Sequence, residues 1–327
     1  METAKAISDW ILEIGDFPFI FRAGAWKPRT SPNTFQGVGA ESLAWLQEVK
    51  ATYHVPVATE VATPEHVELA LKAGMDYLWI GARTSASPIA VSAIGSAIED
   101  LRLEIEDFSL KGVLIKNPVN ADAALWLGNI ERLEKTGVPV MAVHRGCNHQ
   151  PCWSMAHVVR KARPDIPMLL DPSHMSGNAA KVPALMGKID ELGLDGAMIE
   201  VHHKPSEALS DAKQQISPEV LTAALKDRFA ERQKTANAQR QDTELNWLRA
   251  EIDELDETLW ATIAARMDVS KRIGEWKKEH GVAPLQPERY REIGERLKAK
   301  GESLGLPAEF VTRVWESIHE QSLKEQK

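Results

Sequence analysis

The chain has 327 residues, a formal net charge of -8 and two cysteines, Cys147 and Cys152. This length suits a barrel joined to a small second domain, and the negative charge argues against a nucleic-acid partner. Two cysteines make no disulfide framework, residues 1–10 lack the pattern of a secretion signal, and no apolar run approaches the ~20 residues that cross a membrane. We therefore expect a soluble, cytoplasmic protein of two domains that binds small molecules.

Short apolar runs alternate with helix-like segments over the first two thirds of the chain. Because these runs are continuously apolar, they are expected to be buried on both faces, as in a parallel sheet covered by helices. The pattern predicts the α/β class and a TIM (β/α)8-type barrel over residues 1–228, with seven recognisable strands and one apparently missing. The runs span residues 17–24, 56–61, 77–81, 112–116, 139–143, 167–171 and 197–201.

The sequence changes character after the last predicted strand. Residues 229–242 are polar, without Gly, Pro or a strand signal, and we interpret them as a partly helical linker. From residue 243 to 327 the pattern is helical, with apolar residues three and four apart from Leu245 to Ile263. It predicts an all-α domain with one long helix over 243–279 and two shorter helices near 288–300 and 307–324.

Cationic side chains follow most of the predicted strands. The carboxyl ends of all strands of a parallel barrel lie on one face, so these cations are expected to converge. One such side chain alone is usually a solvated loop residue. A converging set predicts a pocket for a doubly charged anion, because guanidinium groups bind phosphate or carboxylate oxygens in pairs. The set comprises Arg22, Lys27, Arg29, Arg83, Lys116, His144 and Arg145.

A second group of polar residues follows the last two predicted strands. It consists of His174, Glu200 and Asp211. Imidazole with two carboxylates is a ligand set for a divalent metal such as Mn²⁺, Fe²⁺ or Zn²⁺. The alternative interpretation is a hydrogen-bonded Asp–His pair in a loop.

Seven motifs in order resemble the type I 3-deoxy-D-arabino-heptulosonate 7-phosphate (DAHP) synthases, specifically their β subgroup, over roughly residues 10–225. The motifs are KPRTSPNTFQG, IGART, LIKNPVN, HRG, DPSH, MIEVH and LSDAKQQ. The resemblance implies condensation of phosphoenolpyruvate with erythrose 4-phosphate, the first step of aromatic biosynthesis, at a divalent metal (Mn, Fe, Co or Zn). By position it implies Arg22, Lys27, Arg83, Lys116 and Arg145 around phosphoenolpyruvate and the reaction centre, Arg29 and Thr30 at the sugar phosphate, and His174, Glu200 and Asp211 at the metal.

Two departures from the family stand out. The family has an earlier strand ending in a GPCS motif, whose cysteine is the fourth metal ligand, and this chain passes from Ile20 to Phe21 without it. The loop after Gly146 is also shorter than in the family. We predict that at least one departure reflects residues missing from the printed chain, at Ile20–Phe21 or at Cys147–Asn148. We interpret Cys147 as a small buried thiol rather than a substitute ligand.

Residues 243–327 resemble the all-helical chorismate mutases. The patterns are ELNWLRAEIDELDETLWATIAARMDVSKRIGEWKKEHGVAPLQPERY and FVTRVWESIHEQSLKEQ. The resemblance implies that Lys277 and Gln326 face the ether oxygen of the substrate while arginines hold its two carboxylates. Related mutases often carry Glu at the position of Tyr290, so recognition of the ring hydroxyl is expected to differ. The implied cage comprises Arg249, Arg266, Lys277, Arg289 and Gln326.

The implied cage needs no cofactor, because a pericyclic rearrangement involves no nucleophile or proton transfer. Its geometry predicts a homodimer or a higher homo-oligomer. Arg249 and Arg266 are 17 residues apart on one predicted helix, which places them about 25 Å apart along it and about 100° apart around it. One compact substrate cannot meet both from the same helix, so the two are expected to serve different sites of a dimer.

These observations predict a bifunctional enzyme with small anionic substrates and no nucleic-acid or membrane partner. An alternative from another functional class is an active chorismate mutase whose degenerate barrel has a structural or regulatory role. A true absence of the strand that ends in the GPCS motif would favour it. A different phosphosugar aldolase on the same fold is a further alternative, and a surface-charged dimerisation module is the alternative for the helical region. Any feedback control is expected to act through the mutase region, by binding of prephenate or chorismate.

Overall fold

The structure, a computed structural model, describes residues 5, 18–28, 33–106, 108–235 and 243–326. The chain divides into two compact units, Met1–Glu251 and Ile252–Lys327. In the described part of the chain, no helix is both long enough and apolar enough to cross a membrane.

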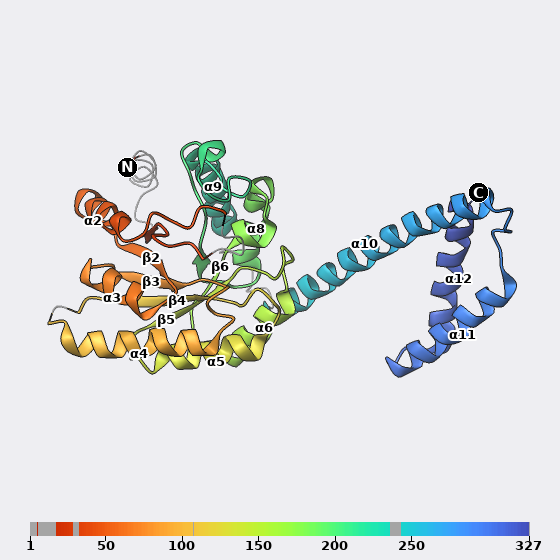
Figure 1. Ribbon diagram of the computed structural model, residues 1–327, viewed down its shortest axis with the longest axis horizontal. Coiled ribbons are helices and arrows are strands. Elements are labelled where there is room, and N and C mark those ends of the chain that lie inside the picture. Colours follow the sequence, from red (N-terminus) through yellow and green to blue (C-terminus); the bar gives the residue numbers. More distant parts are fainter. Residues whose placement is uncertain (1–4, 6–17, 29–32, 107, 236–242, 327) are drawn as a thin grey trace. The chain divides into compact units, whose positions relative to one another are not determined.

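A parallel sheet of seven strands, paired in chain order, forms the centre of the first unit (Figure 1). The edge strands β1 and β7 each pair with a single neighbour in the described part of the chain. The prediction of a barrel-type sheet that lacks one strand is therefore confirmed. The strands are β1 (Phe21–Arg22), β2 (Val57–Val61), β3 (Tyr77–Ile80), β4 (Gly112–Lys116), β5 (Val140–His144), β6 (Met168–Leu170) and β7 (Gly196–Ala197).

The two edge strands are shorter than the apolar runs that predicted them. The run at 17–24 yields only Phe21–Arg22, and the run that begins at residue 197 contributes a single residue to Gly196–Ala197. An edge strand has one hydrogen-bonding partner instead of two, so fewer of its residues are held in the sheet. After β7 the chain makes one further parallel bridge, between Val201 and Ile216.

Helices connect the strands, as the alternation predicted. Several begin at a side chain that accepts a hydrogen bond from the first turn: Thr63, Ser87 and Asp122 cap α3, α4 and α5. The helices of this unit are α2 (Glu41–Tyr53), α3 (Pro64–Lys72), α4 (Pro88–Glu104), α5 (Ala123–Glu134), α6 (Trp153–Ala162), α7 (Pro172–Ser176), α8 (Val182–Glu191) and α9 (Pro218–Thr235), with short 3-10 turns at Ala179–Lys181 and Pro205–Glu207.

The strands separate two apolar layers. The larger layer lies between the sheet and its helices and includes Leu78, Ile80 and Ile115. The smaller layer lies inside the curved sheet, and alternate residues of the strands supply it. Its buried members are Ala58, Trp79, Leu114, Val143 and Met198.

Both junctions at which we predicted missing residues lie in the described chain, and that prediction stays a prediction. Phe21 follows Ile20 directly into β1, where its backbone N–H bonds to the carbonyl oxygen of Pro56 at 2.9 Å. After β5, Cys147 and Gln150 exchange two backbone hydrogen bonds of 2.8 Å across a tight turn. The loop is short because these four residues close it.

The helical region consists of α10 (Thr243–Glu279), α11 (Pro287–Ser303) and α12 (Ala308–Glu325), which confirms the predicted long helix and two shorter ones. The first turns of α10 belong to the barrel unit, where Trp247 is buried. Its ring stacks on His157 of α6 at 5.5 Å, and His157 also bonds to Glu244 and Glu251. The domain limits at 228 and 243 remain a prediction, and residues 236–242 lie outside the described chain.

Candidate active sites

The strand register explains where the polar residues of the barrel gather. Side chains two residues apart on a strand point to the same side of the sheet. Most strands that supply a residue to the inner apolar layer have a charged side chain two positions later, either on the strand itself or in the loop after it. Beyond Ala58, Leu114, Val143, Leu169 and Met198 these are Glu60, Lys116, Arg145, Asp171 and Glu200.

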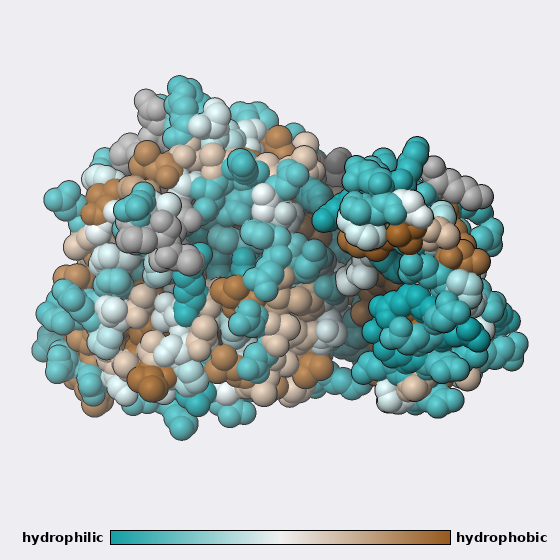
Figure 2. All heavy atoms as spheres, turned by 45° about the vertical axis from the view of Figure 1, so that its right-hand side comes forward, coloured by the Kyte–Doolittle hydropathy of each residue, from teal (hydrophilic) through white to brown (hydrophobic). Residues whose placement is uncertain are grey.

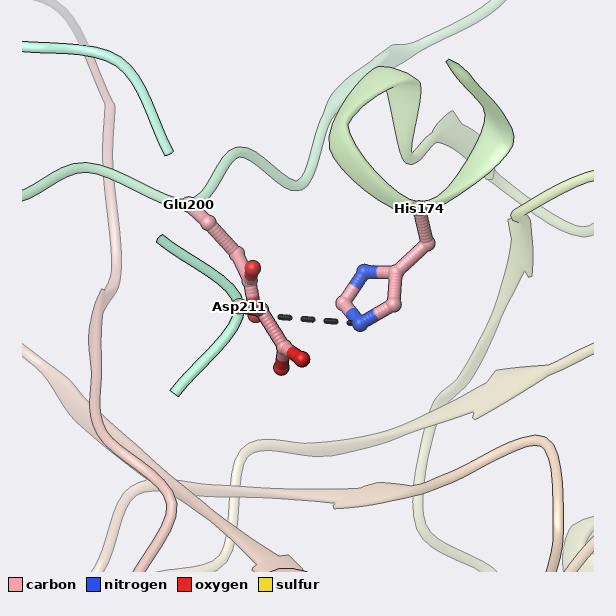
Figure 3. A group of neighbouring side chains, drawn as sticks. All are labelled: His174, Glu200 and Asp211. Atoms are coloured by element: carbon pink, nitrogen blue, oxygen red, sulfur yellow. Dashed lines mark ion pairs between the residues drawn. The ribbon is translucent and has the colours of Figure 1, made fainter. Parts of the chain in front are cut away.

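The carboxyl ends of the strands form what we call the mouth of the barrel. His174, Glu200 and Asp211 come together there, as predicted. One ligand atom from each lies within 4.8 Å of the others, and in the described part of the chain they are the one group of this kind. Their side chains point toward one another in Figure 3, where the dashed line joins His174 to Glu200, 3.7 Å from Nε2 to Oε1. One imidazole nitrogen and two carboxylates fit a divalent cation.

Asp171 holds the imidazole of His174 in place. Its carboxylate accepts hydrogen bonds from the backbone N–H of His174 at 3.0 Å, from the Nδ1 side of the ring, and from Lys116 Nζ at 2.7 Å. Burial acts to raise the pKa of Asp171, but the charges of His174 and Lys116 outweigh it and hold that pKa well below its usual value. With Nδ1 turned to Asp171, Nε2 is the ring atom directed at Glu200, an arrangement typical of metal-binding histidines.

Glu200 and Asp211 are each anchored from a different direction. Glu200 Oε2 accepts a hydrogen bond of 2.9 Å from Gln214, and Asp211 has a left-handed backbone with φ of 52°. Burial would raise the pKa of Glu200, but the charges of His174, Arg22 and Lys27 outweigh it, so the pKa is lowered. Glu200 is therefore ionised at neutral pH and suited to a cation.

Lys27 lies against these carboxylates. Its ammonium group pairs with Asp211, bonds to Ser210 Oγ at 2.7 Å and lies 3.9 Å from Glu200 Oε1. In this structure Lys27, which the resemblance places at the reaction centre, therefore lies against the carboxylates of Glu200 and Asp211, which it assigns to the metal.

The other predicted cations take different positions around the mouth. Arg22 lies over the ring of Trp79 at 5.3 Å, and its buried Nε and Nη2 have no hydrogen-bond partner among the described residues. Arg145 is buried, and desolvation lowers its pKa. Arg83 donates to the carbonyl oxygen of Pro28 at 3.1 Å. Buried guanidinium atoms without a partner indicate space for an anion.

Three predicted positions need comment. Arg29 and Thr30 lie outside the described residues. His144, which we grouped with the cations, is the last residue of β5 and is packed between Trp126 and Trp153. Its alternation along the strand turns it away from the mouth, and burial lowers its pKa to about 4, so it is neutral.

Cys147 is buried, with its Sγ 3.9 Å from the amide nitrogen of Asn117. It does not belong to the His174–Glu200–Asp211 group.

Sequence reasoning missed Glu60 and Asp171. Both lie on the inward face of a strand or directly after one, which the two-residue period of VATEV and MLLD indicates in retrospect. Glu60 approaches Gly81 so closely that a Cβ there would lie 2.1 Å from its Oε1. Burial raises the pKa of Glu60, and nearby charges, first that of Lys116, only partly offset it.

In the helical unit, two of the predicted cage cations bond to α12 or to the residue directly after it. Arg266 donates to Ser322 of α12, and Lys277 Nζ donates to Gln326 Oε1 at 3.0 Å. Lys277 and Gln326, both of which the resemblance assigns to the ether oxygen of the substrate, are therefore neighbours. Arg289 is exposed and pairs with Glu292 at 2.7 Å.

The fifth cage residue, Arg249, is exposed on the part of α10 that belongs to the barrel unit.

Fold and site together define a barrel-type parallel α/β sheet that carries a candidate metal centre beside a group of cationic side chains. Residues 1–235 match the family model described as DAHP synthetase I family, and residues 248–327 match the model for chorismate mutase type II. The chain belongs to the DAHP synthetase I family, and a chorismate mutase type II region follows the barrel in the sequence.

Individual relatives agree with both assignments. A phospho-2-dehydro-3-deoxyheptonate aldolase of Thermotoga maritima is 31% identical over 244 residues, which cover 73% of this chain and 66% of that protein. Its crystal structure superposes with a TM-score of 0.59 at 27% identity, covering 69% of this chain and 64% of that one. The chain thus spans just under two thirds of that relative's length. A 4-amino-4-deoxychorismate mutase of Streptomyces venezuelae is 36% identical over 78 residues, 24% of this chain and 76% of that protein.

Proposed function

We propose that the chain is a bifunctional enzyme of aromatic biosynthesis. The barrel condenses phosphoenolpyruvate with erythrose 4-phosphate to DAHP, and the helical region rearranges chorismate to prephenate. The observation that carries the first activity is the His174–Glu200–Asp211 group beside buried guanidinium atoms of Arg22 that have no partner among the described residues. The reaction needs both a cation centre and a site for anions.

In the barrel, Arg22, Arg83, Lys116 and Arg145 hold the phosphate and carboxylate of phosphoenolpyruvate, and Lys27 lies at the reaction centre. Arg29 and Thr30 hold the phosphate of the sugar.

His174, Glu200 and Asp211 hold a divalent metal, one of Mn, Fe, Co or Zn. When bound, this metal supplies a Lewis acid that polarises the sugar aldehyde. Asp171 keeps Nε2 of His174 directed at the metal position through its bonds to the backbone and to Nδ1.

In the helical region, Arg266, Lys277, Arg289 and Gln326 of one chain and Arg249 of a second chain form the cage around chorismate. Rigid cations matched to the charge that develops in the transition state lower the barrier without a cofactor. The helices of this region also expose large apolar side chains, among them Leu255, Leu259 and Trp260. Figure 2 shows hydrophobic residues as brown patches on the surface of the molecule. Covering them in a homodimer removes apolar surface from water.

A second candidate is an active mutase with a degenerate barrel. Two observations favour it: the described sheet has seven strands, and the metal group has three residues with no cysteine among them. In that case the barrel is a structural or regulatory partner of the mutase.

One set of assays separates the two candidates. The purified full chain is loaded in turn with Mn²⁺, Fe²⁺, Co²⁺ or Zn²⁺ and assayed for DAHP formation and, in parallel, for chorismate conversion. The bifunctional proposal expects both activities, with DAHP formation abolished by a chelator and by His174→Ala while chorismate conversion continues. The unaffected mutase shows that the treated chain is still folded. Chorismate conversion without DAHP formation under any of the four metals would favour the degenerate barrel instead.

A further inference from the structure

His319, a histidine of α12 that the sequence analysis passed over, lies beside the proposed mutase cage. His319, Ser322 and Gln326 are three and four residues apart in succession, so they share one face of the helix. Ser322 accepts a hydrogen bond from Arg266, and Gln326 accepts one from Lys277. This face of α12 is therefore the one that meets the two cations.

Aromatic contacts hold the imidazole at this position. The ring of His319 lies 4.6 Å from that of Tyr290 and 5.2 Å from that of Trp315, between centroids. The guanidinium of Arg266 lies 5.5 Å from the centroid of the same Trp315 ring. Tyr290, which occupies the position where related mutases often carry Glu, is thus in direct contact with His319.

Nε2 of His319 is buried and has no hydrogen-bond partner among the described residues. A buried polar atom is costly unless something supplies a partner. Burial, and then the charges of Arg266 and Lys277, lower the pKa of His319. The imidazole is therefore neutral at pH 7, and one ring nitrogen donates a hydrogen bond while the other accepts one.

A small molecule has room to approach this side of the unit. Tyr290 and His319 form part of the wall of a surface cavity of about 420 Å³, whose other walls come from α11, α12 and the residues before α11. Arg266 and Lys277 do not line it. His319 is thus at the boundary between the cation pair and open space.

We propose that His319 is a specificity-determining residue of the mutase region, whose Nε2 forms a hydrogen bond with the ring hydroxyl of the substrate. The inference rests on the proposed mutase function and names the group that recognises the substituent. A hydroxyl both donates and accepts, so it suits either tautomer of the ring. An ammonium group at the same place only donates and is repelled by the two cations nearby. The residue therefore favours chorismate over 4-amino-4-deoxychorismate.

The test compares His319→Met, which removes the nitrogen, with His319→Gln, which keeps a group that bonds to a hydroxyl. The Met variant is expected to lose about tenfold in kcat/KM for chorismate, a typical effect of removing one hydrogen bond from a buried partner. Its affinity for prephenate, measured by calorimetry, falls by a similar factor, and its preference for chorismate over 4-amino-4-deoxychorismate shrinks. The Gln variant stays within about threefold of wild type, as one retained hydrogen bond requires. His280→Met, in the exposed last turn after α10, is the matched control and leaves all three quantities unchanged.

The outcomes are distinguishable. Equal behaviour of the Met and Gln variants, whether both are impaired or both are normal, would show that no hydrogen bond is made and would overturn the assignment. Because prephenate binding is measured without turnover, a wild-type chain that neither converts chorismate nor binds prephenate would refute the mutase function itself, and the assignment with it. A wild-type chain that does both, with an unimpaired Met variant, refutes only the role of His319.

Discussion

A mutase site shared between two chains makes a quantitative prediction. In the structure α10 is one helix from Thr243 to Glu279. Arg249 and Arg266 are 17 residues apart on it, which is about 25 Å at the rise of an α-helix. Arg266 bonds to Ser322 of α12, and Lys277 bonds to Gln326 directly after it, both in their own chain. We therefore expect a site that takes Arg249 from one chain and the other two from its partner.

The perturbation is a pair of single variants, Arg249→Ala and Lys277→Ala, each nearly inactive as a mutase by itself. When the two are unfolded, mixed and refolded, random pairing makes half of the dimers mixed. Each mixed dimer has one site with both residues intact and one with neither, so the recovered activity should approach about a quarter of wild type. Chorismate conversion is the assay, and a size measurement with differently tagged chains confirms that mixed dimers form.

A matched mixture guards against recovery by another route. Arg266→Ala and Lys277→Ala remove two residues that the same chain contributes, so every site in their mixed dimers lacks one of them and no activity returns. If the Arg249→Ala and Lys277→Ala mixture stays as inactive as its parents although mixed dimers have formed, Arg249 does not act across the interface. Equal recovery in both mixtures would refute the assignment of Arg266 and Lys277 to one chain's contribution.

Three further predictions follow from single contacts. Lys27→Gln should raise the affinity of the full chain for Mn²⁺ by about tenfold or more, because the ammonium group of Lys27 competes with the cation for the carboxylates of the metal group. Calorimetry measures this affinity, and Lys50→Gln on α2 is the control. An unchanged affinity in Lys27→Gln would contradict the competition. Burial lowers the pKa of His157, but its hydrogen bonds to Glu244 and Glu251 outweigh this, so the pKa is raised on folding. The stabilisation of the fold by protonated His157 is then complete below the unfolded pKa and is lost as pH rises through the higher folded pKa. The midpoint temperature of thermal unfolding should therefore fall across that pH range in wild type and change less in His157→Gln. Identical pH dependence in the two proteins would disprove this role of His157. Finally, prephenate should inhibit DAHP formation through the mutase region, and Lys277→Ala should weaken that inhibition, whereas undiminished inhibition would place the effector elsewhere.

The sequence by itself determined the alternation of strands and helices, since continuous apolar runs and the helix-like segments between them are local patterns. It also indicated which residue types follow the strand ends, and hence that His174, Glu200 and Asp211 would meet, because parallel strands bring their carboxyl ends to one face. Local pattern likewise predicted the helix from Thr243 to Glu279, whose apolar residues recur three and four apart from Leu245 to Ile263.

Tertiary structure decided which of two neighbouring residues faces the mouth. His144 and Arg145 are adjacent in the sequence, yet His144 packs between tryptophans while Arg145 follows the inward face of β5. The inward position of Glu60 and the bonds from Asp171 to His174 also depend on strand register, which involves residues distant along the chain. The burial of Nε2 of His319 also depends on tertiary structure, because the packing of α12 against its neighbours encloses that atom and no described residue supplies a hydrogen-bond partner for it.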